Sequence, residues 1–339
     1  MTANGLVGLS DRIRRTVGQS PADHGMVRLG PLARTVRRGG GERIPRQFKG
    51  FPYTAPTWPS TVEREEDSSD LGINYDTEWS RNPVSRTVRR ALVEAIMRPG
   101  VQALAAPAVT GLDRLDSVAG PVIFAANHQS HLDTFLLLTV IPTRFRKRMV
   151  VAAGADYFFD KRWKATLSAL SIGAIPIERR KVSRTSSDRA QQLLRQGWSL
   201  MIFPEGGRSP DGWAGEFKAG AAFLSVRTGL PIVPVHIEGT GRILPKGSML
   251  PNRGSTAVTY GEPLHPHEGD DARALSMRME AAIAQLAHEQ SDGWWVARQN
   301  AAAGTTPPLQ GPAGVAGWRK TWALETSKSS RRRPKRSWP

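Results

Sequence analysis

The fold is decided by residues 122–133, which read VIFAANHQSHLD. The apolar run at 122–126 is typical of a buried strand. The polar residues after it predict a loop, and a helix is expected from Leu132. His128 and Asp133 lie at the spacing H-x4-D. An imidazole can take a proton from a hydroxyl, and a carboxylate five residues later can hold the ring in the required tautomer. The pair therefore predicts general-base chemistry.

The composition excludes several other chemistries. The 339 residues contain no cysteine, which rules out disulfides, thiolate metal sites and cysteine nucleophiles. No G-x-S-x-G motif occurs, so the reacting hydroxyl is expected on a substrate rather than on the protein. His131, with His128 and Asp133, offers an alternative metal cluster. Its spacing H-x-x-H-x-D lacks the last histidine of the pattern H-x-H-x-D-H, so we expect neither a metal site nor a cofactor.

Strand and helix patterns alternate on both sides of this stretch. We expect strands at residues 121–126, 148–153, 174–177, 199–203, 231–237 and 256–260, and helices at residues 132–140, 162–170, 186–196, 217–227 and 270–288. Such alternation predicts an α/β fold, with a mostly parallel sheet flanked by helices.

Charge divides the chain into three parts. The net charge is +17, of which residues 1–60 carry +7, residues 298–339 carry +8 and the middle only +2. We expect residues 1–82 to form a disordered basic extension with an acidic linker, and Met26 is an alternative start. The folded domain is expected at 83–290, and residues 291–339 are expected to form a tryptophan-containing, basic, largely disordered tail.

Residues 84–98 predict a short amphipathic helix that ends at Pro99-Gly100. Four apolar residues recur every fourth position in it: Val84, Val88, Leu92 and Ile96. Such a stripe can lie in a membrane interface, or it can pack against the domain. No run of about 18 apolar residues occurs, so we expect no transmembrane helix.

Four segments lie at strand ends or in the loops that follow them, at residues 127–133, 173–179, 203–209 and 230–240. Parallel α/β sheets keep their ligand sites at the carboxyl ends of strands, so we expect these segments to form one site. Arg179 and Arg208 match phosphate oxygens in geometry, and Gly206 lets backbone N–H groups approach an anion. Glu205 is expected to hold one of the arginines in place.

In this combination the chain resembles the glycerophospholipid acyltransferase superfamily, whose members include enzymes that acylate lysophosphatidic acid. The resemblance covers roughly residues 83–290. Its four motifs are matched, in order, by Asn127, His128, Ser130 and Asp133; by Gly173, Ile175, Ile177 and Arg179; by Phe203, Pro204, Glu205, Gly206, Arg208 and Ser209; and by Pro231 and Pro234. Two positions depart from the pattern. Pro176 replaces a frequent aromatic residue and Gly207 replaces a threonine, which bears on the acceptor rather than on the reaction.

The resemblance implies acyl transfer from acyl-CoA or acyl carrier protein to the hydroxyl of a lysophospholipid, 1-acyl-glycerol-3-phosphate above all. Another lysolipid or hydroxyl acceptor is the alternative. The same resemblance implies that His128 is the general base and that Asp133 orients its ring. Arg179, Glu205, Gly206 and Arg208 form the phosphate site, and the supporting residues are Asn127, Ser130, Gly173 and Pro234.

The basic ends favour a polyanionic partner. We expect an anionic membrane surface, which places the protein peripherally at the cytoplasmic, inner face of the cell membrane. Nucleic-acid binding is the alternative from a different class. The middle of the chain is close to neutral, and a nucleic-acid module would carry its charge on the folded domain, so no nucleic-acid partner is expected.

Overall fold

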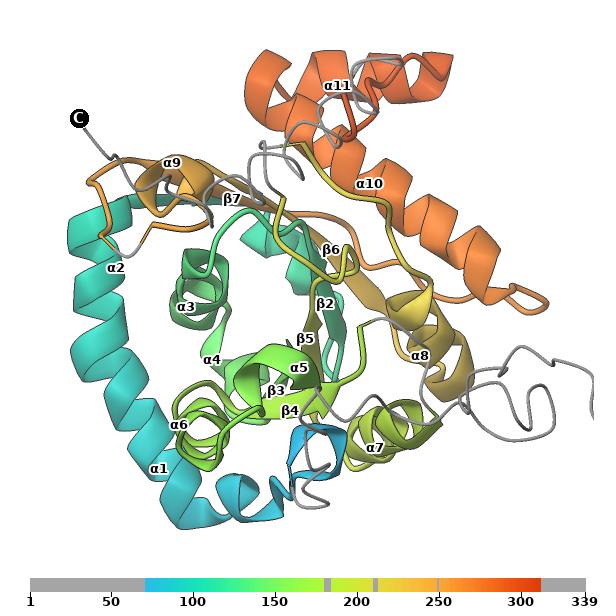
Figure 1. The fold of residues 1–339 in the computed structure, drawn as a ribbon. Helices are drawn as coiled ribbons and strands as arrows, with labels where there is room; N and C mark the ends of the chain where they lie inside the picture. The colour runs from blue at the N-terminus through green and yellow to red at the C-terminus, as the bar shows by residue number, and fades with distance from the viewer. Residues whose placement is uncertain (1–70, 180–183, 210–212, 249, 312–339) are drawn as a thin grey trace, which may run out of the picture. The chain divides into compact units, whose positions relative to one another are not determined.

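The fold is built on a mixed sheet in the order β1-β7-β6-β2-β5-β3-β4 (Figure 1). The computed structural model describes residues 71–179, 184–209, 213–248 and 250–311, and seven strands lie in this part of the chain. They are β1 (Pro107–Thr110), β2 (Ile123–Ala126), β3 (Met149–Gly154), β4 (Ala174–Ile177), β5 (Ser199–Ile202), β6 (Ile232–Glu238) and β7 (Thr256–Tyr260). All neighbours pair in parallel except β6 and β7, which confirms the predicted α/β class.

The six predicted strands are present, and β1 is an addition that the sequence did not reveal. β1 has four residues, opens with Pro107 and lies at an edge, pairing only with β7. Edge strands tolerate proline because one row of their N–H groups has no partner in the sheet. Pro176 has the same explanation, since β4 is the opposite edge strand.

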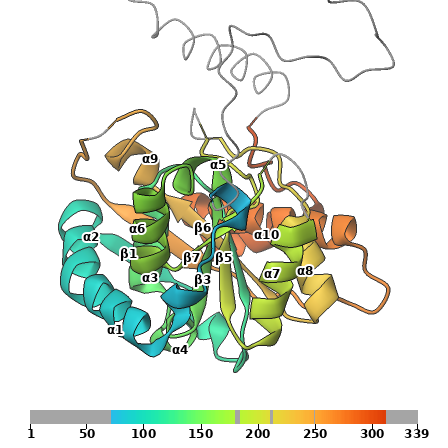
Figure 2. The same ribbon diagram turned by 60° about the horizontal axis from the view of Figure 1, so that its bottom comes forward.

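Helices cover both faces of the sheet (Figures 1 and 2). On one face α3 (Leu132–Val140), α4 (Thr143–Arg146) and α6 (Arg162–Ile172) enclose one apolar cluster. On the other face α7 (Arg184–Arg195), α8 (Gly220–Thr228) and α10 (Ala272–Asp292) enclose a second. Shorter elements are η2 (Gly72–Asn74), η3 (Glu78–Arg81), η5 (Leu112–Leu115), α5 (Ala155–Phe158) and α9 (Thr240–Ile243). Burial on both faces explains why β2 reads as a continuous apolar run.

The predicted helix 84–98 is longer than expected. It consists of α1 (Pro83–Leu92), a π-helical segment η4 (Val93–Met97) and α2 (Arg98–Ala105). The expected end at Pro99-Gly100 is wrong, because Pro99 falls in the first turn of α2, where a proline's missing N–H costs little. The π-helical turn before it shifts the hydrogen-bond ladder, so the chain stays helical to Ala105.

The apolar stripe of this helix faces solvent. Val84 is 72% exposed and Ile96 is 64% exposed. Arg89 is buried instead, and its guanidinium donates to the carbonyl oxygens of Ser80 (2.8 Å), Ala169 (2.7 Å) and Leu170 (2.9 Å). Of the two alternatives for the stripe, packing against the domain is therefore wrong.

The ends of the chain bear on the predicted division into parts. Residues 1–70 and 312–339 lie outside the described residues, so disorder there stays a prediction. The expected disordered tail begins too early, because α10 runs to Asp292 and α11 (Trp294–Ala303) follows it. No helix in the described ranges combines the length and apolar character needed to cross a bilayer.

Candidate active site

Four strands bring the predicted segments to one edge of the sheet. β2 lies between β5 and β6, and β5 lies between β2 and β3, all in parallel. Their carboxyl ends therefore point the same way, and the loops after β2, β4, β5 and β6 meet there (Figure 1). The sequence order of these strands differs from their spatial order, which brings residues 127–133 and 203–209 side by side.

His128 and Asp133 form a hydrogen-bonded pair. His128 Nδ1 lies 2.9 Å from Asp133 Oδ2, and the carboxylate is fully buried. The same oxygen accepts the backbone N–H groups of Gln129 (2.7 Å) and Ser130 (2.8 Å). An ionised carboxylate can only accept hydrogen bonds, so this contact requires the N–H at Nδ1 and leaves Nε2 of a neutral ring as an acceptor.

Asn127 and Ser130 fix the loop that carries this pair. The Asn127 amide donates to the carbonyl oxygen of Ile237 (2.8 Å) and accepts the Ile237 N–H (2.7 Å). The Ser130 hydroxyl donates to the carbonyl oxygen of Leu244 (2.8 Å). Both side chains thus tie the loop to β6 and to the residue after α9.

Glu205 holds the loop of residues 127–133, called the catalytic loop here after the predicted role of His128. It was expected to hold an arginine, and that part of the prediction is wrong. Its Oε1 accepts the N–H of His128 (2.7 Å), and its Oε2 accepts the N–H of Gly215 (2.7 Å). Burial raises the pKa of this carboxyl to about 7, against the two backbone N–H groups, which lower it. The His128 ring also stacks on Phe203, with centroids 4.1 Å apart.

The two arginines differ in how they are held. Arg179 is paired with Asp156, with Nη2 at 2.7 and 2.8 Å from the two carboxylate oxygens and Nε at 3.0 Å. The backbone carbonyl oxygen of Arg208 accepts a hydrogen bond from Lys246 Nζ (3.4 Å). The Arg208 guanidinium makes no hydrogen bond or ion pair with any residue in the described ranges, and burial lowers its pKa. Arg208 therefore has its full donor set available for an anion, and Arg179 does not.

The glycine turn after β5 makes room for a third cation. Gly206 has φ +66°, and a Cβ there would lie 2.8 Å from Lys218 Nζ. Lys218 Nζ in turn donates to the carbonyl oxygen of Arg179. A glycine is needed both for the left-handed backbone and for the close approach of this lysine.

Two predicted supporting residues act at a distance from His128. Gly173 ends α6 with φ +71°, and a Cβ there would lie 3.2 Å from the Arg89 guanidinium. Pro234 lies inside β6, and its ring packs against Gly261. A Cβ added at Gly261 would lie only 2.7 Å from Pro234 Cγ. Both positions stabilise the packing beneath the site.

His131 lines the same cavity as His128. Its ring stacks on Tyr157 and meets Phe158 edge-on, with centroids 5.4 and 6.1 Å apart. Burial first, and then nearby cations led by Arg208, together lower its pKa to about 4. The described residues contain no group of three or more His, Asp or Glu side chains placed to hold a metal ion.

A large cavity opens in front of His128. Its volume is about 690 Å³. Its lining contains charged and polar residues, among them His128, His131, Arg179, Lys218, Glu178 and Glu216. It also contains apolar residues, among them Val151, Ile177, Ile202, Phe217 and Leu224. A cavity of this kind fits an amphipathic molecule with an anionic head and an apolar chain.

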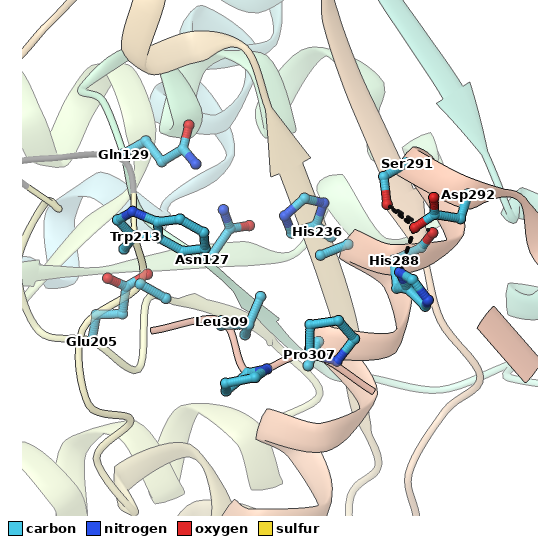
Figure 3. Close-up of a pocket in the computed structure, with 14 residues that line it drawn as sticks. Asn127, Gln129, Glu205, Trp213, His236, His288, Ser291, Asp292, Pro307 and Leu309 are labelled. Carbon is cyan, nitrogen blue, oxygen red and sulfur yellow. Dashed lines mark hydrogen bonds and ion pairs between the residues drawn. The ribbon is translucent and has the colours of Figure 1, made fainter. Parts of the chain in front are cut away.

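A second, smaller cavity lies behind the same loop (Figure 3). Its volume is about 300 Å³. Asn127, Glu205 and Trp213 lie on one side of it in Figure 3 and His288 and Asp292 on the other, with Leu309 between them. His128 and His131 thus line the larger cavity, and Asn127 and Gln129 of the same loop line the smaller one.

Three residues at the site were missed by the sequence interpretation. Asp156 and Tyr157 belong to α5, a single helical turn after β3, and Lys218 precedes α8. The position of α5 could have been predicted from the sequence. It follows the parallel strand β3, whose carboxyl end lies at the same edge of the sheet as that of β2. No sequence pattern places Lys218 at the site. Its side chain reaches the site only because Gly206 has no Cβ in the way.

Part of the chain is similar in sequence to known acyltransferases. A family model described as "Acyltransferase" matches residues 106–238, which include the four segments up to Glu238. A chloroplastic 1-acyl-sn-glycerol-3-phosphate acyltransferase of Arabidopsis thaliana is 33% identical over 166 residues, which are 48% of this chain and 44% of that protein. The human 1-acyl-sn-glycerol-3-phosphate acyltransferase alpha is 31% identical over 180 residues, 50% of this chain and 60% of that one.

The matched region is only part of these proteins, since the chain spans about half the length of the curated relatives it matches. Among solved structures, a 1-acyl-sn-glycerophosphate acyltransferase from Thermotoga maritima has a TM-score of 0.48 and 23% identity. The match covers 64% of this chain and 84% of that one.

Proposed function

We propose that this chain, which belongs to the glycerophospholipid acyltransferase superfamily, transfers a fatty acyl group from a thioester to the hydroxyl of a lysophospholipid. The acceptor is 1-acyl-glycerol-3-phosphate and the product is phosphatidic acid. The observation that carries the proposal is the His128–Asp133 pair at 2.9 Å, with His128 lining a cavity whose other lining residues include Arg179, Lys218 and many apolar side chains.

His128 acts first as a base and then as an acid. With Nδ1–H held by Asp133, Nε2 takes the proton of the acceptor hydroxyl, and the oxygen attacks the thioester carbonyl carbon. The carbon–sulfur bond breaks, and the imidazolium returns its proton to the leaving thiolate. The scheme uses no metal, no further cofactor and no acyl-enzyme; acyl-CoA or acyl carrier protein serves as co-substrate.

The acceptor phosphate binds where Arg179 and Lys218 line the cavity, with Arg208 close to the lining residue His131. Arg208 supplies free guanidinium donors, which suit phosphate oxygens. Lys218 and the third Arg179 nitrogen, Nη1, border the same space around Gly206, where Nη1 lies 3.5 Å from the carbonyl oxygen. The apolar lining beyond them takes a fatty acyl chain, since burying each methylene stabilises binding by about 0.8 kcal/mol.

The protein reaches its lipid substrate from the membrane surface. The solvent-facing stripe of α1 and η4 supplies apolar contact, with Val84 and Ile96 well exposed. The basic residues of the two chain ends supply attraction to anionic lipids, at about 1 kcal/mol for each basic residue near the surface. We propose a peripheral location at the inner face of the cell membrane.

The test is a product analysis. The purified protein is incubated with labelled acyl-CoA or labelled acyl carrier protein and with a panel of lysophospholipids, and the product lipid is identified. Labelled phosphatidic acid from 1-acyl-glycerol-3-phosphate is expected. Labelling of another lysolipid alone would keep the reaction and correct the acceptor. No product with any acceptor, together with a gel shift on nucleic acid that survives removal of both basic ends, would replace the proposal.

A further inference from the structure

The C-terminal segment 307–311, called the strap here, passes behind the catalytic loop. It lies outside the region that matches the family model and about 180 residues after His128. Pro307, Pro308 and Leu309 line the cavity of about 300 Å³ together with Asn127 and Glu205, as Figure 3 shows for the labelled members. The strap supplies no group to the cavity in front of His128.

Two contacts join the strap to residues 213–215. The carbonyl oxygen of Leu309 accepts the N–H of Ala214 (3.1 Å). Gly311 lies against the Trp213 ring, and a Cβ there would be 2.9 Å from ring atom Cδ2. Gly311 also has φ +81°, a conformation that favours glycine.

Two further connections run from residues 213–215 to the catalytic loop. The N–H of Gly215 donates to Glu205, whose other oxygen accepts the N–H of His128. The Ser209 hydroxyl donates to the carbonyl oxygen of Trp213 (2.6 Å), and the Ser209 N–H donates to the carbonyl oxygen of His128 (2.8 Å). Both backbone polar groups of His128 therefore depend on a segment that the strap holds.

The strap is itself anchored to the fold. Leu309 packs against the apolar cluster formed by α7, α8 and α10, and the Gln310 amide donates to Glu280 of α10. The cavity behind the loop leaves Asn127 and Glu205 without close packing on that side. Because few side chains press on the loop from behind, the hydrogen-bond connections through 213–215 carry its positioning.

We infer that the strap is a positioning element for His128, acting through Trp213, Ala214 and Gly215. It fixes the backbone of the histidine from behind while Asp133 fixes its ring. The inference rests on the proposed acyl transfer for its kinetic consequence only. A shift of about 1 Å in a catalytic group can cost up to roughly 100-fold in rate, so a loosened strap lowers turnover without touching the substrates.

Two glycines provide a matched test. Gly311→Ala places a methyl against the Trp213 ring, whereas Gly304→Ala places one where no atom lies within 4 Å. Both have positive φ, 81° and 68°, so both share the backbone penalty. We expect Gly311→Ala to lower kcat roughly tenfold with little change in either KM, and Gly304→Ala to leave kcat unchanged. Equal kcat values in the two variants would overturn the inference.

A second readout does not depend on activity. The amide N–H groups of His128 and Gly215 should exchange with solvent faster in Gly311→Ala than in Gly304→Ala, because both donate to Glu205. Gln310→Ala, which removes the anchor to α10, should act in the same direction. Unchanged exchange in both Gly311→Ala and Gln310→Ala rejects the strap. If exchange responds while the wild-type protein acylates no acceptor, the strap stands and the proposed function fails.

Discussion

The catalytic edge of the sheet and the N-terminal helix both bury charged side chains, and they do so with opposite backbone groups. At the edge, Asp133 and Glu205 accept backbone N–H groups. On the helix, Arg89 donates to three backbone carbonyl oxygens. In each case the backbone compensates a charge that has lost its water.

The difference lies in what the buried charge positions. Asp133 fixes the ring of His128 and Glu205 fixes its backbone N–H, and His128 itself lines the larger cavity. Arg89 is surrounded by packed helix ends and fixes the rotation of α1, so that Val84 and Val88 face solvent. In this protein the buried carboxylates orient His128, which borders a cavity. The buried Arg89 orients α1 and so determines which side chains of that helix face solvent.

The largest expected effect falls on the catalytic edge. His128→Ala should lower acyl transfer on the order of 100- to 10,000-fold, because the general base is lost. Asp133→Asn should lose most of the same activity, since an amide can present a donor to Nδ1 and favour the wrong tautomer. Thermal unfolding of His128→Ala should stay close to wild type. Near-normal turnover of His128→Ala would remove the mechanism.

The next effect falls on the helix. Arg89→Met should lower the free energy of unfolding by about 1–3 kcal/mol, because it leaves the carbonyl oxygens of Ser80, Ala169 and Leu170 without their donor. Arg90→Met, one residue later on the exposed side, should change it by less than about 0.5 kcal/mol. Urea unfolding measures both. Equal losses would show that Arg89 contributes only surface charge.

The sequence predicted the sheet well because its pattern and its burial agree. The strands at 174–177 and 256–260 have the observed bounds, and the loop after β2 carries the expected pair. Apolar runs of four to six residues between turn residues have few other outcomes in an α/β chain. The catalytic pair was visible because both members lie within six residues.

The N-terminal helix was predicted, but its C-terminal end and the direction of its apolar stripe were not. Its apolar stripe predicted either a packed face or an interfacial one, and a buried arginine has no sequence signal until the carbonyl oxygens of Ser80 and Ala169 are seen beside it. Glu205 was misassigned in the same way. Its partners, His128 and Gly215, are backbone N–H groups, which every residue but proline has. A hydrogen bond to a backbone group does not depend on the residue type of the partner, so it cannot be predicted from the sequence.

The two arginines test how the catalytic edge uses its cations. Arg208→Ala should raise KM for the lysolipid roughly tenfold, about 1.4 kcal/mol, with little change for the thioester. Arg179→Ala should act more weakly, about threefold, because Asp156 already occupies two of its nitrogens. Steady-state kinetics with each substrate varied in turn distinguishes them. An equal rise in KM for the thioester would assign the arginines to the donor instead.

The smallest effect concerns the surface that Arg89 orients. Replacing Val84, Val88 and Ile96 together by serine should weaken binding to anionic vesicles about tenfold, since these side chains project into solvent and can bury apolar area in the headgroup region. Met277→Ser, an equally exposed change on α10, is the control. Unfolding free energies should stay within about 0.5 kcal/mol for each substitution, because the stripe contributes little to the core. Binding that salt abolishes, and that the triple substitution leaves unchanged, would assign attachment to the basic ends, and the exposed stripe would then have no role at the membrane.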